Sequence, residues 1–384
     1  MAEPSSQRGP HHEIFARSGP LVVLFSGTNK PDHAFDFWGY AQRSRASTIL
    51  LNNGSNRWYQ AGVPGFGDSV ADTAALIRRW AKHLSATEIC CIGASMGGSA
   101  AVMYGSLVDA RVLAFSFEAH IRHVGSRSVK YIPEDYPLTH PDLTPLITAS
   151  KRPITSLLGG EDVIDLAEAS RLMTMPNLQL NVLRGVDHGV PRHLRINGKL
   201  DAVLDAFVAG RPLPPLEEED DDLDAPAYMA AIEASHLAYG DGKPLDSLVD
   251  AERACALRPF SFAARLLAGR ALMKLKRPAE ALPHLGLAVS LTTGSSEARL
   301  LFGRALRSMG RLRHAAAYHA ATHELFPQEH RVLYDLSLAL WSMGDHARAL
   351  KQLETACQMV PQNTAYTQKK AQLLESMKLS ARKK

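Results

Sequence analysis

The stretch Glu88–Tyr104 reads E-I-C-C-I-G-A-S-M-G-G-S-A-A-V-M-Y and decides the fold of the first half of the chain. It opens with a short apolar run of β-formers, and small residues crowd the positions after Ser95. The run predicts a buried strand, and the small residues predict a helix that lies close against a sheet. Between the two, the pattern G-x-S-x-G places Ser95 on a tight turn. Glycine neighbours are needed there because a Cβ atom would collide with the strand or the helix.

Further apolar runs on both sides of this stretch predict a sheet. The predicted strands are Leu21–Ser26, Thr48–Leu51, Glu88–Ile92, Arg111–Phe117, Ile154–Leu158 and Leu178–Leu183. Helical spacing appears between strands at Val70–Leu84 and again near Leu194–Val208. This alternation predicts a doubly wound, mostly parallel α/β sheet, whose ligands bind at the carboxyl ends of the strands. Cys90 and Cys91 are neighbours on one strand, so they are expected to point to opposite faces as small core residues.

Two later loops follow predicted strands in the same way as the Ser95 turn. Gly159-Gly160-Glu161-Asp162 follows one strand, and Arg184-Gly185-Val186-Asp187-His188-Gly189 follows the next. Since both loops lie at carboxyl ends of strands, they belong to the same edge of the sheet as Ser95. The chain therefore carries a serine, an acid and a histidine, in that order, at one edge.

Residues 13–210 resemble the α/β-hydrolase superfamily in the serine turn, the G-x-x-D after a late strand and the glycine-flanked histidine before the last helix. The resemblance implies that Ser95 is a nucleophile and that His188 is its general base. It implies that Asp162 orients the imidazole, with Asp165 left open as the alternative acid. Asp187 lies next to His188 in the chain and is expected at most to support the Ser95, His188 and acid group without being part of it.

The resemblance also implies an oxyanion hole made of backbone N–H groups. One donor would be Met96, which follows the serine. The second would come from the loop after the first strand, at Gly27 or Thr28. The H-G-G-G motif of lipases is absent here, because this loop reads Ser26-Gly27-Thr28-Asn29. No metal and no organic cofactor are expected.

The segment between Phe117 and Pro153 falls where related hydrolases insert a cap over the pocket. It is rich in histidine, tyrosine, proline and basic residues, among them Arg122, His123, Arg127 and Lys130. These four residues either attract an anionic or sugar-like substrate or form a solvated surface loop. The sequence leaves both interpretations open.

Residues 211–226 read R-P-L-P-P-L-E-E-E-D-D-D-L-D-A-P and separate two different sequence patterns. Prolines stiffen such a segment, and its seven acidic residues repel one another. This composition predicts a linker between two domains.

Residues 227–378 repeat with a period of 34 residues. The repeating positions are Gly269, Gly303 and Ser337; Leu272, Leu306 and Leu340; Ala281, Ala315 and Ala349; and Pro259, Pro327 and Pro361. Gly310 and Gly344 fall between the helices of a pair. The pattern resembles tetratricopeptide repeats, which implies an all-α solenoid that binds a protein partner or self-associates. Tyr228–Arg258 is expected to be a degenerate first copy, and residues 363–378 a capping helix.

Composition excludes several classes of function. The chain has 384 residues, 46% of them hydrophobic, and a net charge of +4. Basic residues are not interleaved with aromatic ones, so nucleic-acid binding is not expected. The sequence contains neither an apolar signal segment nor a run of about 18 apolar residues that would span a membrane. Four cysteines without C-x-x-C spacing fit a reducing compartment, and a cytoplasmic location is expected.

The function predicted from these patterns is a serine hydrolase that cleaves a small acyl ester or thioester through an acyl-Ser95 intermediate. Two alternatives stay open. One is a non-catalytic tetratricopeptide scaffold with a degenerate hydrolase domain. The other is an acyltransferase that uses the same triad and an acceptor hydroxyl on a surface polysaccharide.

Overall fold

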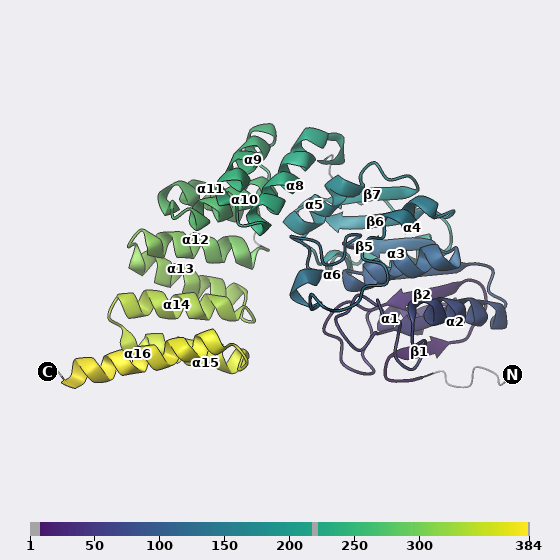
Figure 1. Ribbon diagram of the computed structural model, residues 1–384, viewed down its shortest axis with the longest axis horizontal. Coiled ribbons are helices and arrows are strands. Elements are labelled where there is room, and N and C mark those ends of the chain that lie inside the picture. Colours follow the sequence, from purple (N-terminus) through teal and green to yellow (C-terminus); the bar gives the residue numbers. More distant parts are fainter. Residues whose placement is uncertain (1–7, 217–221, 293, 383–384) are drawn as a thin grey trace. The chain divides into compact units, whose positions relative to one another are not determined.

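A computed structural model describes residues 8–216, 222–292 and 294–382. The chain divides into two compact units between Asp241 and Gly242 (Figure 1). We call the first the α/β unit and the second the repeat unit, and each is described by itself.

The α/β unit is built on one twisted sheet of seven strands in the order β1-β3-β2-β4-β5-β6-β7. The strands are β1 His12–Phe15, β2 Leu21–Phe25, β3 Ser47–Leu51, β4 Ile89–Ala94, β5 Arg111–Phe115, β6 Ile154–Gly159 and β7 Leu178–Leu183. All neighbours pair in parallel except β1, which pairs antiparallel with β3. The six predicted strands and the mostly parallel sheet are confirmed, and β1 adds an edge strand that was not predicted.

Helices cover both faces of this sheet, as a doubly wound fold requires. One face packs against α1 (Trp38–Arg43), α6 (Val190–Ile196) and α7 (Leu200–Val208). The other packs against α2 (Val70–His83), α3 (Met96–Val108) and α4 (Thr144–Ala149). Cys90 belongs to the first core and Cys91 to the second, and neither is exposed. The prediction that their side chains point to opposite faces is confirmed.

The strand order reverses between β2 and β4. The chain passes from β2 to β3 on one side and returns to β4 on the other side of β2. Loops after two such strands diverge and leave a crevice at the carboxyl edge of a sheet. The loop at Ser26 and the turn at Ser95 flank this switch point, where an α/β sheet most often holds its ligand.

The division between the units lies later in the chain than the predicted linker. Leu213 and Leu216 of the predicted segment 211–226 pack on the core that contains α7. The 3-10 helix Asp222–Asp224 follows, and then α8 (Pro226–Gly240) packs on α5 (Val163–Leu172) inside the α/β unit. Apolar side chains and a docked helix therefore hold part of this segment to the α/β unit. Residues 217–221 of the predicted linker lie outside the described residues.

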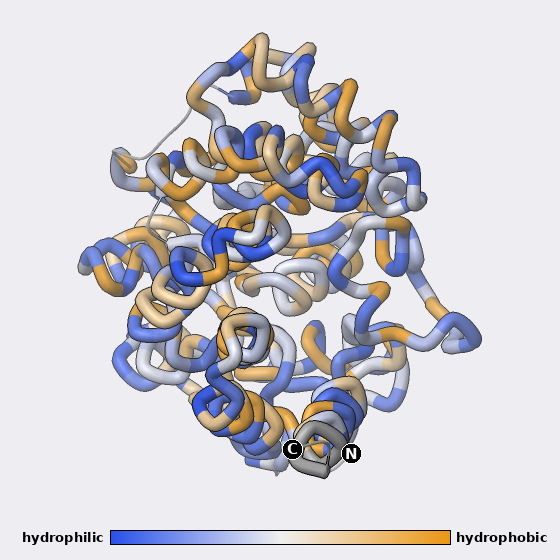
Figure 2. The backbone as a smooth tube through the Cα atoms, turned by 90° about the vertical axis from the view of Figure 1, so that its left-hand side faces the viewer, coloured by the Kyte–Doolittle hydropathy of each residue, from blue (hydrophilic) through white to orange (hydrophobic). Residues whose placement is uncertain are grey.

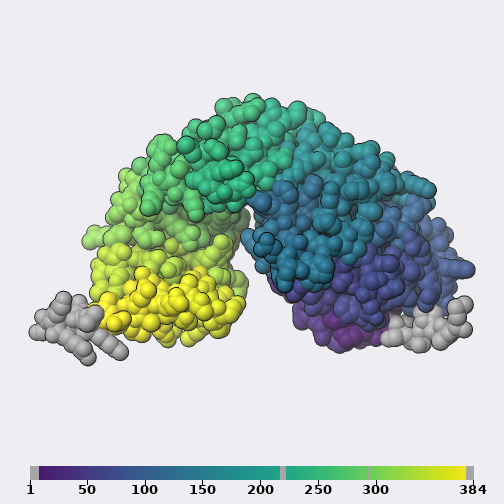
Figure 3. Space-filling view, viewed as in Figure 1, coloured from purple at the N-terminus to yellow at the C-terminus, as the bar shows by residue number. Residues whose placement is uncertain are grey.

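The repeat unit consists of consecutive antiparallel helices. They are α9 Pro244–Leu257, α10 Phe262–Lys274, α11 Pro278–Leu291, α12 Ser296–Ser308, α13 Leu312–Leu325, α14 His330–Ser342, α15 His346–Met359 and α16 Thr364–Arg382. Each helix packs on the next, and successive repeats form bands from green to yellow in Figure 3. Hydrophobic and hydrophilic residues alternate along the chain path, as expected for helices with one buried face (Figure 2).

Small residues allow the repeat helices to touch, as predicted. Ala281, Ala315 and Ala349 are fully buried. A Cβ atom on Gly269 would come within 2.4 Å of the Leu285 side chain. The predicted first copy, Tyr228–Arg258, is corrected in one respect: its first helix, α8, packs on α5 of the α/β unit. The predicted capping helix is α16. Among the described residues, no helix is both long and apolar enough to cross a membrane.

Candidate active site

Ser95 occupies a strained turn between β4 and α3. Its backbone lies at φ 56° and ψ −123°, which a residue with a side chain rarely adopts. A Cβ atom on Gly93 would lie 1.9 Å from the carbonyl oxygen of Gly97, and one on Gly97 would lie 2.2 Å from that of Phe25. Both glycines are therefore required by the backbone, as the G-x-S-x-G pattern predicts.

A chain of hydrogen bonds joins the serine, the histidine and an acid. Ser95 Oγ lies 2.9 Å from His188 Nε2. His188 Nδ1 lies 2.8 Å from Asp165 Oδ1 and 3.1 Å from Oδ2. The His188 side chain is 25% exposed and that of Asp165 only 3%, so the acid is buried behind an imidazole that solvent can reach. Three elements far apart in the chain, α3, α5 and the loop before α6, bring these groups together.

The acid in contact with His188 is Asp165, not Asp162. Asp162 is the N-cap of α5: its Oδ1 accepts hydrogen bonds of 3.0 Å from the N–H groups of Ile164 and Asp165. Arg127 pairs with the same oxygen. Asp165 lies one turn further along the helix and reaches the imidazole. The sequence left Asp165 open as the alternative acid, and the structure shows that Asp165 makes the contact.

Asp187 points away from the imidazole beside it in the chain. Its Oδ1 accepts a 2.8 Å hydrogen bond from the N–H of Gly189, and its Oδ2 pairs with Arg192 at 2.7 Å. Asp187 thus shapes the loop that carries His188 and stays outside the hydrogen-bonded chain.

The surrounding charges set the proton affinity of the site. Burial would lower the pKa of His188 and Arg127 opposes its charge, but the charge and hydrogen bond of Asp165, together with the charge of Asp162, raise that pKa above the ordinary value. Burial would likewise raise the pKa of Asp162, yet Arg127 and its other partners lower it to about 2. Asp162 is therefore ionised at neutral pH.

Of the three predicted donors to the oxyanion, the structure leaves two N–H groups available and engages the third. The N–H of Gly27 donates a 2.8 Å hydrogen bond to Asp36 Oδ2, so Gly27 is removed as a donor. Ser26 Oγ accepts from the N–H of Asp36 at 3.1 Å and closes the same loop. Within the described residues, the N–H groups of Met96 and Thr28 have no acceptor. Met96 begins α3, where first-turn N–H groups and the helix dipole favour negative charge.

The basic residues of the segment after β5 are engaged within the protein or lie in solvent. Arg122 donates 2.8 Å hydrogen bonds to the carbonyl oxygens of Pro133 and Tyr136, and Arg127 pairs with Asp162 and lies 3.5 Å from Asp165. His123 and Lys130 are exposed. Arg122 is thus engaged within its own segment and Arg127 with the aspartates of α5, which favours a structural interpretation over substrate attraction by these two residues.

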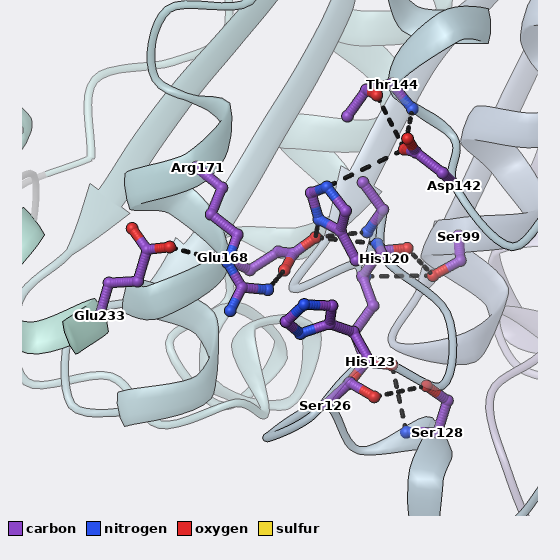
Figure 4. Close-up of polar contacts among 12 residues, drawn as sticks. Ser99, His120, His123, Ser126, Ser128, Asp142, Thr144, Glu168, Arg171 and Glu233 are labelled. Carbon is purple, nitrogen blue, oxygen red and sulfur yellow. Dashed lines mark hydrogen bonds and ion pairs between the residues drawn. The ribbon is translucent and has the colours of Figure 1, made fainter. Parts of the chain in front are cut away.

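Glu168 of α5 anchors this segment (Figure 4). Its Oε1 accepts from the N–H groups of Ala119 and His120, and lies 3.0 Å from His120 Nδ1. Its Oε2 pairs with Arg171, which also binds Glu233 of α8 at 2.9 Å. Burial would raise the pKa of Glu168, but the hydrogen bond with His120 and its other partners lower it. The sequence offered no signal for this network, because its members lie on separate elements.

One group of residues has the composition of a metal site. Asp162, Asp165 and His188 place potential ligand atoms within 4.8 Å of one another. However, both ring nitrogens of His188 have protein partners. The Arg127 guanidinium contacts both carboxylates. Ion pairs and hydrogen bonds therefore account for the arrangement of these side chains.

A surface hollow of about 730 Å³ is not part of this site. Tyr40, Arg43 and Arg211 line it, together with Pro20 and Ala46. The last two precede β2 and β3, so the hollow lies at the amino ends of the strands. Ser95 lies at the opposite edge of the sheet.

Comparison with known proteins identifies the second half of the chain. The family model Tetratricopeptide repeat (TPR_16) matches residues 232–295 and 300–364. No curated protein matches the chain.

Several solved structures are similar to part of the chain. YrrB, described as a TPR protein with an unusual peptide-binding site, is 22% identical over 55% of this chain and 93% of its own, with a TM-score of 0.37. MamA from Desulfovibrio magneticus RS-1 is 16% identical over 40% of this chain and 86% of its own, also with a TM-score of 0.37. A thermophilic TPR protein from Thermus thermophilus is 17% identical over 46% of this chain and 98% of its own, with a TM-score of 0.35. The family match and the 34-residue period agree: the C-terminal region of this chain consists of tetratricopeptide repeats.

Proposed function

We propose that the protein is a serine hydrolase that cleaves an acyl ester or thioester through a covalent acyl-Ser95 intermediate. The observation that carries the proposal is the unbroken chain from Ser95 Oγ through both nitrogens of His188 to Asp165, with contacts of 2.9 and 2.8 Å. A serine hydroxyl is a weak nucleophile unless a base takes its proton during attack. His188 is placed to do this, and Asp165 holds it in the required tautomer.

In the first half of the reaction, Ser95 Oγ attacks the carbonyl carbon of the substrate while its proton passes to His188 Nε2. A tetrahedral intermediate forms and carries a negative oxygen. Asp165 stabilises the imidazolium cation at the same time. His188 then gives its proton to the leaving alcohol or thiol, the bond to the leaving group breaks, and the acyl group stays on Ser95.

In the second half, a water molecule takes the place of the leaving group. His188 Nε2 accepts a proton from this water, and the resulting hydroxide attacks the acyl-Ser95 carbonyl. The proton then returns to Ser95 Oγ and the free acid departs. The N–H groups of Met96 and Thr28 are the proposed donors to the negative oxygen in both halves. These groups satisfy the chemistry without a metal or an organic cofactor.

The repeats suggest what the second half of the chain contributes. Stacked helix pairs form an extended surface that typically binds another protein. We infer that the repeat unit brings the hydrolase to a protein partner or to a second copy of this chain. The proposed substrate site lies within the α/β unit, so the two functions use different surfaces.

The test is labelling by a fluorophosphonate, which reacts with activated serines. We expect the wild-type chain to be labelled, and both Ser95→Ala and His188→Ala to lose the label. Ser106→Ala is the matched control, because Ser106 lies on the same helix α3 and its hydroxyl has no hydrogen-bond partner among the described residues. A folded wild-type chain that takes up no label, or a Ser95→Ala variant that is labelled as fast as the wild type, would refute the proposal.

A further inference from the structure

Two carboxylates compete for one imidazole in this site. Asp162 and Asp165 are three residues apart at the start of α5, and both have an oxygen within 4.8 Å of a His188 nitrogen. Only Asp165 makes the contact, at 2.8 Å. The N-cap bonds of Asp162 engage one of its oxygens, but they do not by themselves keep its charge from His188. Another group must decide which acid orients the imidazole.

Arg127 is in position to decide it. Its guanidinium pairs with Asp162 Oδ1 and lies 3.5 Å from Asp165 Oδ1. Its side chain is 23% exposed, so its charge acts in a largely dry environment. Arg127 comes from the segment after β5, an element that contributes nothing else to the hydrogen-bonded chain.

The backbone around Arg127 is firmly held. The Glu118 carboxylate accepts hydrogen bonds from the N–H groups of Arg127 and Ser128. On the other side, His236 of α8 lies 2.9 Å from the carbonyl oxygen of Gly125. A buried acid and a docked helix thus fix a short loop that brings one guanidinium to the two aspartates.

We propose that Arg127 is a positioning residue for the Ser95–His188–Asp165 chain: by binding Asp162, it leaves Asp165 as the carboxylate that orients His188 and offsets the second negative charge. This inference rests on the proposed function and adds the residue that controls the proton affinity of its base. The sequence singles out Arg127 only as one basic residue of the segment after β5 and gives no sign that it contacts the two aspartates.

The charges that face His188 make the effect predictable. Asp162 and Asp165 face it from α5, and Arg127 faces it from the segment after β5. Asp187, on the loop of His188, is neutralised by Arg192. Arg127 lowers the pKa of His188, and Asp162 raises it. Removing the Arg127 charge should therefore raise the pKa of His188, and removing the Asp162 charge should lower it.

The experiment measures the rate of fluorophosphonate labelling against pH. Only neutral His188 accepts the Ser95 proton, so the acid limb of the profile reports its pKa. In Arg127→Gln we expect this limb to move to higher pH by about one unit or more. Arg127→Lys, which keeps the charge, should leave the acid limb close to its wild-type position. In the control Arg122→Gln, which removes a guanidinium bound to Pro133 and Tyr136 on the same segment, the limb should stay in place.

Asp162→Asn gives the opposite arm. Asparagine still caps a helix, so α5 is retained, while the negative charge is lost. The acid limb should move to lower pH, and the double variant Arg127→Gln/Asp162→Asn should return toward the wild type. If Arg127→Gln does not fold, the position of the acid limb in Asp162→Asn alone tests the proposal. An acid limb that stays in place in a folded Arg127→Gln, or in Asp162→Asn, overturns the proposal.

A second readout separates this proposal from the proposed function. The ring signals of His188, assigned by their loss in His188→Gln, can be titrated by NMR without any catalysis. A raised His188 pKa in Arg127→Gln supports the role of Arg127 even if the wild type takes up no label. Labelling of the wild type with an unmoved His188 pKa in the variant would uphold the hydrolase and reject Arg127.

Discussion

One histidine of each unit has a pKa that its surroundings change, and the two pKa values change in opposite directions. In the α/β unit both nitrogens of His188 have partners, Ser95 and Asp165, and the pKa of His188 is raised. In the repeat unit His319 of α13 is fully buried, and neither ring nitrogen has a partner among the described residues. Burial lowers the pKa of His319 to about 4. The comparison shows that partners, not burial, make a histidine ready to exchange a proton.

The largest expected effect distinguishes the two aspartates of α5. Asp165→Asn should reduce the labelling rate and any esterase activity by about 10³-fold to 10⁴-fold, because asparagine favours the wrong tautomer of His188. Asp162→Asn should reduce the labelling rate less than about tenfold at the pH optimum, because Asp162 caps the backbone of α5 and pairs with Arg127 but does not contact His188. Labelling rates of the purified variants measure both. Equal losses in the two variants would mean that the site does not use Asp165 in this way.

The next effect compares close packing in the two units. Gly97→Ala would drive a Cβ atom to 2.2 Å from the Phe25 carbonyl oxygen, and backbone cannot move aside easily. We expect a loss of about 3 kcal/mol or more in the free energy of unfolding of the α/β unit. Gly303→Ala would bring its Cβ atom to 2.4 Å from the His319 ring, a side chain that can shift. This variant should cost about 1 to 2 kcal/mol in the repeat unit.

Denaturant unfolding followed by circular dichroism measures both variants. Gly286→Ala is the matched control, because its nearest neighbour, a Phe302 ring atom, would lie at an ordinary 3.4 Å. Alanine also favours a helix interior over glycine. A Gly97→Ala chain as stable as this control would contradict the account of the Ser95 turn.

The last expected effect is the pH dependence of the repeat unit. The folded pKa of His319 is lowered from 6.5 to about 4, so the unfolded chain binds more protons between these values. Neutral His319 therefore makes its full contribution to the free energy of unfolding above about pH 6.5. This contribution, about 3 kcal/mol in total, is lost as the pH falls toward 4. His188, whose pKa is raised, contributes in the opposite sense: its stability is present below pH 6.5 and is lost as the pH rises through its folded pKa.

Thermal unfolding of His319→Leu against the wild type measures this contribution. The variant should lose stability less steeply than the wild type as the pH falls. His314→Gln, an exposed histidine on the same helix α13, should keep the wild-type slope. Parallel slopes for wild type and His319→Leu would show that His319 is protonated in the folded chain.

Much of the α/β unit could be predicted because its signals are local. The apolar runs mark the strands, and the glycines around Ser95 mark the turn that their missing Cβ atoms permit. His188 was predicted from its place between a strand and a helix. These signals needed only the residues within a few positions of each feature.

The parts that could not be predicted depend on contacts between distant elements. Asp162 caps α5 and pairs with Arg127, and only the folded chain shows that Asp165 reaches His188. Gly27 is removed as a donor because Asp36 folds back onto its N–H. The placement of α8 rests on Glu233 and His236, whose partners lie in the α/β unit. A repeat period records none of these contacts.

The measurement that tests the central claim most directly is mass spectrometry of the chain mixed with an activated acyl ester and quenched early. The account predicts one added acyl group, located on the peptide that contains Ser95, in the wild type. It also predicts no such adduct in Ser95→Ala. Turnover of the ester by a Ser95→Ala chain, or an acyl group found only on another residue, would contradict the claim that Ser95 is the nucleophile.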